Sequence, residues 1–254
     1  MKTAPTPPTL QQRLAERSRP PGPVVMYQRW EQLLFLHWRH DPAVVQASLP
    51  PGLTVDTFKG AAWLGLVPLF MRDVRPRFVP PVPGISDFLE LNARTYVFDA
   101  DGRPGLYFYS LDCDQPLAVE SARRLLHLRY EHCAMQAAVA DDGRVDFRAR
   151  GAGSGEESRF RYRASGSGRQ IADEESLEFF LIERYRLFAS DADGEQRSSV
   201  RVCHAPYRLR SVELAEWSDA MLRWAGFDPG ARPPEHVCAA EPVEVEVFAP
   251  ERVG

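Results

Sequence analysis

The stretch SDFLELNARTYV, residues 86–97, decides the fold of this chain. Successive side chains of a strand point to opposite faces, so Glu90, Asn92, Arg94 and Tyr96 share one face. The residues between them, such as Leu91, form an apolar face. A half-buried strand would turn the polar row to water, whereas a closed sheet would line a cavity with an acid, an amide, a guanidinium and a phenol. Alternation alone allows both arrangements.

The composition is that of a globular protein, with 44% hydrophobic and 26% charged residues in a chain of 254. The net charge of −4 argues against nucleic-acid binding, which needs a basic face. Four cysteines lie far apart without a C-x-x-C pair, so we expect free thiols in a reducing compartment. Because we find no apolar run of about 18 residues and no signal peptide, we expect a cytoplasmic protein without a membrane partner.

Two segments differ in composition. Residues 1–23 are rich in proline and predict a disordered tail, with one short helix between Thr9 and Arg17. Residues 24–254 predict a single domain, since all-β domains of this length are often undivided.

Alternating and buried apolar runs recur along that domain. They predict roughly ten strands, including a hairpin of 53–58 with 61–74 and another hairpin that begins with the strand of interest. Helical spacing of apolar residues predicts helices at 116–128, 174–185 and 212–226. The expected fold is therefore mainly β with inserted helices (α+β), built on an antiparallel closed β-barrel or cone.

Four segments together resemble one protein family. They are W-x-x-LLFLHW at 30–38, AAWLGLVPLFM at 61–71, FLELNARTYV at 88–97 and LEFFLIERYRLF at 177–188. In this order they resemble the YqjF-like family of uncharacterised bacterial proteins (domain of unknown function 2071), within the acetoacetate-decarboxylase-like superfamily. The resemblance covers about residues 26–248. It implies a β-barrel or cone with a central small-molecule cavity, which the row from Glu90 to Arg94 would face.

The resemblance also raises the question of a Schiff-base lysine, which the decarboxylase uses. The segment that corresponds to its lysine pair lies around Ala122, Arg123 and Arg124, and it contains no lysine. Arginine stays protonated and is a poor nucleophile. Lys59, the only lysine of the domain, lies in a predicted turn. We therefore expect chemistry without a Schiff base and without a cofactor.

Glu90 and Arg94 are the candidate catalytic residues. Arg94 could donate two parallel hydrogen bonds to a carboxylate or enolate oxygen, and Glu90 could act as a general acid or base if burial raises its pKa. The alternative is a buried Glu90–Arg94 pair that only fixes the strand. The candidate ligand-binding residues are Asn92, Tyr96, Tyr109, Ser110, Asp112 and Arg123. Asp112 could instead cap the helix that begins near Pro116.

Patterns for other chemistries are missing from the sequence. Zinc sites need three or four convergent ligands, whereas His204 and His236 are isolated and His127 and His132 lack the H-E-x-x-H pattern. We therefore expect no metal. A G-x-S-x-G elbow and a phosphate-binding loop are also absent from the sequence.

The sequence thus predicts a barrel that binds a small oxo- or carboxylate-bearing molecule. Any catalysis would be lysine-independent acid–base work of the lyase or isomerase type, such as enolisation, dehydration or cyclisation. The alternatives are a non-catalytic carrier or sensor on the same barrel, and an interaction scaffold that uses the Pro-rich loop 76–84 and the N-terminal tail as contacts. Exposed sheet edges would also allow a homodimer.

Overall fold

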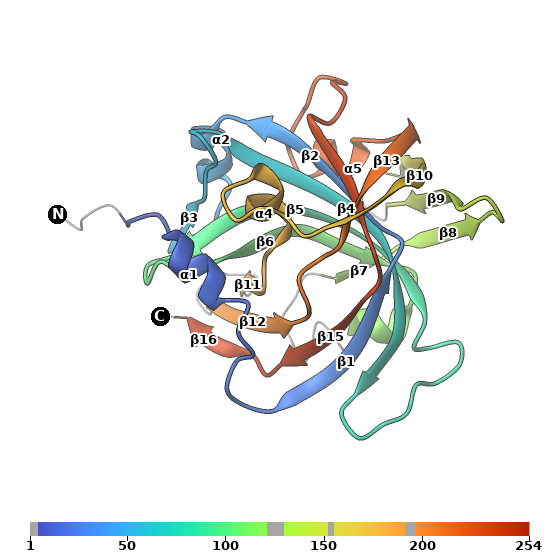
Figure 1. Ribbon diagram of the computed structural model, residues 1–254, viewed down its shortest axis with the longest axis horizontal. Helices are drawn as coiled ribbons and strands as arrows, with labels where there is room; N and C mark the ends of the chain where they lie inside the picture. Colours follow the sequence, from blue (N-terminus) through green and yellow to red (C-terminus); the bar gives the residue numbers. More distant parts are fainter. Residues whose placement is uncertain (1–4, 121–129, 152–154, 191–196, 254) are drawn as a thin grey trace.

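The computed structural model describes residues 5–120, 130–151, 155–190 and 197–253, and these are mainly strands (Figure 1). The helices are α1 (Leu10–Ala15), α2 (Pro42–Ala47), α4 (Leu177–Ile182) and α5 (Ala220–Trp224). The strands are β1 (Val24–Glu31), β2 (Leu33–His40), β3 (Leu53–Val55), β4 (Ala62–Pro76), β5 (Phe88–Asp99), β6 (Pro104–Cys113), β7 (Tyr130–His132), β8 (Ala134–Val139), β9 (Arg144–Arg150), β10 (Glu157–Gln170), β11 (Arg186–Ser190), β12 (Arg197–Cys203), β13 (Leu209–Glu216), β14 (His236–Ala240), β15 (Val243–Phe248) and β16 (Glu251–Val253).

Seven of the described strands close into a ring. Their order is β4-β5-β6-β11-β12-β15-β1, and the antiparallel pairing of β1 with β4 completes the circle. The β6–β11 contact is parallel, with Leu187 opposite Leu106. The other six pairings are antiparallel. This confirms the predicted mainly-β, closed architecture.

The remaining large part of the sheet is an arm that continues from β4. It consists of β2, β14, β13, β10, β9 and β8, in that order. The arm curls over the outer face of β4 and β5, so that β8 comes into contact with β5. Two apolar cores result: one inside the ring, which includes Val67 and Leu111, and one between β5 and the arm, which includes Leu91 and Phe147.

Strand β5 lies between the two cores and is buried along its whole length. Glu90, Asn92 and Arg94 point into the ring, where they line a cavity. Leu91 and Ala93 point to the arm and belong to its core. The polar row of the opening stretch therefore faces the inside of a closed sheet.

The N-terminal segment contains the short helix that the sequence predicts between Thr9 and Arg17. Helix α1 begins after Thr9, whose side chain accepts a hydrogen bond from the backbone N–H of Gln12, while the Gln12 side chain accepts one from the backbone N–H of Thr9. Such a capping box supplies partners for N–H groups that a helix leaves free. The helix lies against the ring, as its ion pair between Arg13 and Asp56 shows.

Two predicted elements are wrong. Residues 212–226 were expected to form one helix, but Leu209–Glu216 is a strand that pairs with β10 and β14, and only Ala220–Trp224 is helical. Leu214, Trp217 and Met221 have a helical spacing, whereas Val212 and Leu214 alternate as in a strand, and pairing with two strands decides between the two periods. The hairpin of 53–58 with 61–74 is also wrong, because β3 pairs with β5.

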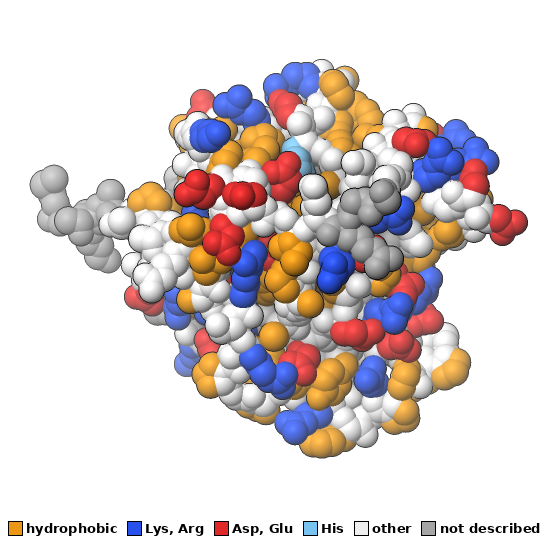
Figure 2. Space-filling model, in the orientation of Figure 1, with side chains coloured by type: hydrophobic (Ala, Val, Ile, Leu, Met, Phe, Trp, Pro, Cys, Tyr) orange, Lys and Arg blue, Asp and Glu red, His pale blue; other side chains and the backbone are white. Residues whose placement is uncertain are grey.

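Charged side chains of both signs are interspersed over the face shown in Figure 2. On the arm, for example, Arg159 of β10 pairs with Asp146 of β9 at 2.6 Å, and Arg163 pairs with Glu213 of β13 at 2.7 Å. Among the described residues, no helix is both long enough and apolar enough to cross a membrane.

Candidate functional site

The ring encloses a cavity of about 70 Å³, which is enough for a few ordered waters or a small ligand. Most of its wall is apolar, with Leu69, Phe108 and Val202 as examples, and all seven ring strands contribute to it. The polar side chains in the wall are Gln28, Glu90, Asn92, Arg94, Tyr130, Arg184 and Tyr207. An apolar cavity with a few convergent polar groups is the usual form of a small-molecule site.

Glu90 is held by two donors. The Tyr130 hydroxyl of β7 donates to Glu90 Oε2 at 2.7 Å, and Asn92 Nδ2 donates to Glu90 Oε1 at 3.2 Å. Burial, above all, raises the pKa of Glu90, although both hydrogen bonds act against this rise. A raised pKa brings a carboxyl closer to the range in which it can act as a general acid or base.

Arg94 has different partners. Its guanidinium lies over the rings of Phe35 and Tyr96, at 5.3 and 5.9 Å from their centroids. Its Nη2 donates to the carbonyl oxygen of Leu181 at 3.4 Å, and its buried Nε has no hydrogen-bond partner. Glu90 and Arg94 thus have separate hydrogen-bond partners.

Arg184 brings a second guanidinium to the cavity. It follows α4, and its Nε donates to the carbonyl of Phe180 at 2.7 Å. Its Nη1 donates to Asp56 Oδ2 at 3.0 Å, whereas its buried Nη2 has no partner. Burial lowers the pKa of Arg184 to about 10, which still leaves the group charged near neutrality.

The sequence did not assign Tyr130 or Arg184 to the cavity. Tyr130 begins a strand of three residues that runs parallel to β6, and no alternation pattern marks so short a strand. Arg184 lies between α4 and β11, a position that by itself indicates a role in joining the two elements. Its hydrogen bond to Asp56 fits such a role, and the residue also lines the cavity.

A β-bulge changes the role of three predicted ligand-binding residues. Ala93 pairs with Ser110 while Arg94 pairs with Phe108, so Tyr109 is an extra residue in β6. Phe108 therefore lines the cavity, whereas Ser110, Asp112 and Tyr109 do not.

These three side chains lie elsewhere. The Ser110 hydroxyl donates to the carboxylate of Asp112, whose pKa burial raises. The Tyr109 hydroxyl forms a hydrogen bond with Ser48 of 2.7 Å. A bulge shifts the alternation by one residue, and this explains why Ser110 and Asp112, which pair with the arm-facing Ala93 and Leu91, do not share the cavity-facing side of Phe108.

The other two predicted residues have different outcomes. Tyr96 shares the inward face of β5 but is completely buried beyond the cavity wall, where its ring packs against Phe180. Arg123 lies outside the described residues.

One residue pair inside the fold contradicts the expectation that His236 is isolated. Its Nδ1 lies 2.9 Å from Nδ1 of the buried His37. Burial lowers the pKa of both imidazoles, and for His37 the neighbouring His236 and Arg94 lower it further. The described part of the chain contains no group of three or more His, Cys, Asp or Glu side chains placed to hold a metal ion. Lys59 is exposed in a turn and is not part of the cavity wall.

Comparisons with known proteins agree with this architecture. The profile of the DUF2071 family, described as an uncharacterized conserved protein, matches residues 27–244. The uncharacterized protein YqjF of Bacillus subtilis is 35% identical over 196 residues, which cover 77% of this chain and 79% of YqjF.

Solved structures of the acetoacetate-decarboxylase-like fold are also similar. The enduracididine biosynthesis enzyme MppR complexed with pyruvate has a TM-score of 0.61 at 15% identity, and the match covers 95% of this chain and 94% of MppR. Acetoacetate decarboxylase from Legionella pneumophila has a TM-score of 0.57 at 14% identity, with 92% and 88% covered. These likenesses confirm the acetoacetate-decarboxylase-like fold.

Proposed function

The chain belongs to the DUF2071 family, and we propose that it binds a small carboxylate- or oxo-bearing molecule in the cavity of its ring. One observation carries this proposal. Asn92 Oδ1, Arg94 Nε and Arg184 Nη2 are buried polar atoms of cavity-lining residues, and none has a hydrogen-bond partner within the protein. A buried polar group without a partner costs about 1–3 kcal/mol, so such groups mark a place where a ligand binds.

The charges of the two arginines favour an anionic or strongly polarised oxygen. Guanidinium groups bind carboxylates through parallel hydrogen bonds. Pyruvate, which is bound in the MppR structure, combines a carboxylate with an oxo group, and this supports pyruvate and related short oxo acids as the first ligands to test.

Acid–base catalysis on such a ligand would use Glu90. Arg94 and Arg184 would stabilise an enolate oxygen, while Glu90 would take a proton from the neighbouring carbon and return it elsewhere. Since the cavity wall contains no lysine, this chemistry is lysine-independent and corresponds to enolisation, dehydration or cyclisation. Lyase or isomerase activity is therefore the enzymatic form of the proposal.

A non-catalytic carrier or sensor is the second candidate, and the hydrogen bonds that Glu90 accepts favour it. Both carboxylate oxygens of Glu90 already accept a hydrogen bond, from Tyr130 and from Asn92. A carboxylate held in this way orients its neighbours well but abstracts a proton less readily. In either form we place the protein in the cytoplasm, since its four cysteines are free thiols, and a homodimer stays part of the proposal.

The test is a thermal-unfolding screen against pyruvate, acetoacetate and short dicarboxylates, with the wild type, Arg94→Met and Arg103→Met. Arg103 is a matched control, because it pairs with the buried Asp99 at 2.6 Å but lies outside the cavity wall. A ligand at a hundred times its Kd stabilises the folded state by about 2.7 kcal/mol. We expect this stabilisation in the wild type and in Arg103→Met, and its loss in Arg94→Met.

Equal stabilisation of the wild type and Arg94→Met would contradict the proposed site. A wild type that no compound of this class stabilises would contradict the proposed ligand class. For any ligand found, proton NMR of the mixture over time separates the two candidates: an enzyme converts the ligand or exchanges its carbon-bound protons with deuterium, whereas a carrier returns it unchanged.

A further inference from the structure

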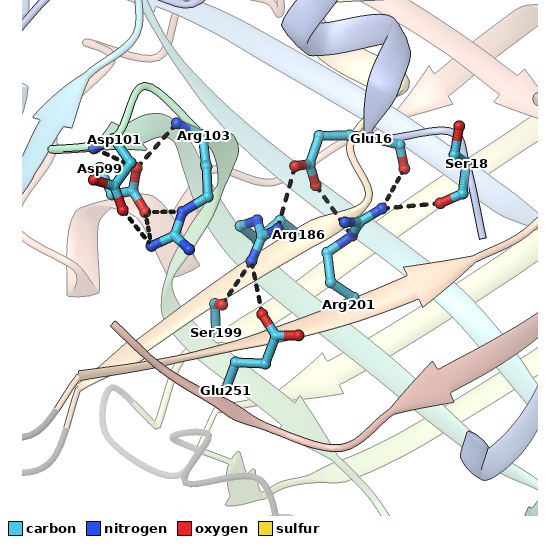
Figure 3. Close-up of polar contacts among 9 residues, drawn as sticks. All are labelled: Glu16, Ser18, Asp99, Asp101, Arg103, Arg186, Ser199, Arg201 and Glu251. Atoms are coloured by element: carbon cyan, nitrogen blue, oxygen red, sulfur yellow. Dashed lines mark hydrogen bonds and ion pairs between the residues drawn. The ribbon is translucent and has the colours of Figure 1, made fainter. Parts of the chain in front are cut away.

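The N-terminal strap, residues 9–19, is fastened to the outside of the ring by a network of charged groups (Figure 3). Glu16 Oε1 accepts from Arg186 of β11 at 3.2 Å, and Glu16 Oε2 lies 3.0 Å from Arg201 Nε of β12. Arg201 Nη2 also donates to the backbone carbonyls of Glu16 and Ser18, at 2.7 and 3.1 Å. Because Glu16 and Arg186 are both buried, this network fixes the strap in one position on the barrel.

From this position the strap reaches Asp56. Arg13 donates two hydrogen bonds to its carboxylate, from Nη1 to Oδ2 at 2.6 Å and from Nη2 to Oδ1 at 2.8 Å. The Arg13 guanidinium also lies 5.2 Å above the ring of Phe180. Asp56 is only 1% exposed, and its backbone N–H donates to the carbonyl of Tyr96 on β5 at 2.8 Å. Asp56 is thus a fixed acceptor between the strap and the ring.

The same carboxylate holds Arg184 of the cavity wall. Arg184 Nη1 donates to Asp56 Oδ2 at 3.0 Å, so this oxygen receives hydrogen bonds from two arginines. The other oxygen, Asp56 Oδ1, accepts a hydrogen bond from Arg13 Nη2. Arg184 therefore makes a single contact with Asp56, and its Nη2 has no partner within the protein.

We propose that Arg13 and Asp56 are positioning residues for the ligand: Arg13 occupies the second oxygen of Asp56, which keeps the second amino group of Arg184 available to a carboxylate or oxo group in the cavity. This inference rests on the proposed function. It makes the N-terminal strap a part of the ligand site, although the strap contributes no residue to the cavity wall.

The physical reason is competition for one carboxylate. An arginine and a carboxylate bind best through two parallel hydrogen bonds. Without Arg13, Asp56 Oδ1 would be a buried acceptor with no charged donor, and Arg184 could supply one by turning Nη2 toward it. A carboxylate of the ligand would then have to compete with Asp56 for that amino group. Arg13 prevents this, since its own two-point contact with Asp56 is already complete.

Arg13→Met in the full chain tests the inference. Arg19→Met is its matched control, since Arg19 belongs to the same strap, is 58% exposed and pairs with Glu246 away from Asp56. Arg13→Lys keeps the charge but makes a one-point contact. The first readout is Kd for pyruvate by titration calorimetry. We expect Kd to rise about tenfold in Arg13→Met, the equivalent of one charged hydrogen bond, to rise less in Arg13→Lys, and to stay within about twofold of wild type in Arg19→Met.

The second readout needs no ligand. The guanidinium Nε–H resonance of Arg184 is assigned by its loss in Arg184→Lys, and we expect it to shift in Arg13→Met and to stay in place in Arg19→Met. A lower Tm of Arg13→Met with an unchanged Arg184 resonance and an unchanged Kd would reduce Arg13 to a structural anchor and overturn the inference. A shifted resonance in a protein whose wild type does not bind pyruvate would support the positioning of Arg184 and contradict the proposed ligand instead.

Discussion

The two faces of strand β5 are equally buried but are built in opposite ways. Toward the arm, Leu89, Leu91 and Ala93 pack into an apolar core with β2, β8, β9 and β10. Toward the ring, Glu90 and Arg94 face a cavity that neither the strand nor its neighbours fill. The arm face leaves no polar group to satisfy, whereas the ring face carries a guanidinium nitrogen without a partner. One face therefore supplies stability, and the other faces the proposed ligand site.

The largest effect should come from the arm face. Leu91→Ala removes a side chain that is 2% exposed, and such truncations lower the free energy of unfolding by about 2–5 kcal/mol. We expect urea unfolding to show this loss, while a saturating ligand still raises the Tm by about the wild-type amount. A loss below about 1 kcal/mol, or a variant that folds but no longer responds to ligand, would break the division between the two faces.

The second largest effect should be a gain in stability, on the ring face. Arg94 is a buried charge whose Nε is unpaired, and among the described residues its guanidinium donates one hydrogen bond, to the Leu181 carbonyl at 3.4 Å. Arg94→Met keeps roughly the length of the side chain and removes the cost of burying a charge with an unpaired donor. We therefore expect the unfolding free energy without ligand to rise by about 1–3 kcal/mol. Urea unfolding of both proteins measures it. A variant that melts several degrees lower than wild type would mean that Arg94 holds the barrel together.

The closed sheet could be predicted from the sequence because local and global signals agree in β5. Polar and apolar residues alternate there, both faces are buried, and the family resemblance selects the inward direction for the polar row. The same reasoning fails at residues 212–226, where Leu214 belongs to a helical pattern with Trp217 and Met221 and to a strand pattern with Val212. Only the pairing of that segment with β10 and β14 decides its structure, and those partners lie far away in sequence.

Only the part of the candidate site that lies on the single strand β5 could be predicted from the sequence. Glu90, Asn92 and Arg94 share a face by alternation, and the structure places all of them in the cavity wall. The bulge at Tyr109 arises from the fit of two strands, so it turns Ser110 and Asp112 away without a local signal. Tyr130 and Arg184 approach from segments 40 and 90 residues further along the chain, as their numbering shows, and only closure of the ring brings them to Glu90 and Arg94.

The smallest effect concerns Glu90 and depends on pH. Burial raises the pKa of Glu90 above its ordinary value of 4.5, so the folded state binds the proton more tightly than the unfolded state. The stability that this carboxyl contributes is complete below 4.5 and is lost as the pH rises through the raised, folded-state pKa. Glu90→Gln stays neutral, so its stability relative to wild type should increase across this window, by about 1.4 kcal/mol for each unit of the shift.

Urea unfolding at a series of pH values between about 4 and 8 measures this difference, and Asp146→Asn provides the contrast from the surface of the arm. The hydrogen bond from Arg159, above all, lowers the pKa of Asp146 to about 2. Its contribution is therefore present above the ordinary value of 3.8 and is lost only as the pH falls through about 2. Between pH 4.5 and the folded-state pKa of Glu90, the difference in unfolding free energy between Asp146→Asn and wild type should therefore not change with pH. If the unfolding free energy of Glu90→Gln relative to wild type is also independent of pH, the hydrogen bonds from Tyr130 and Asn92 keep Glu90 ionised. The ring face would then hold a fixed carboxylate, and the carrier would be the better form of the proposed function.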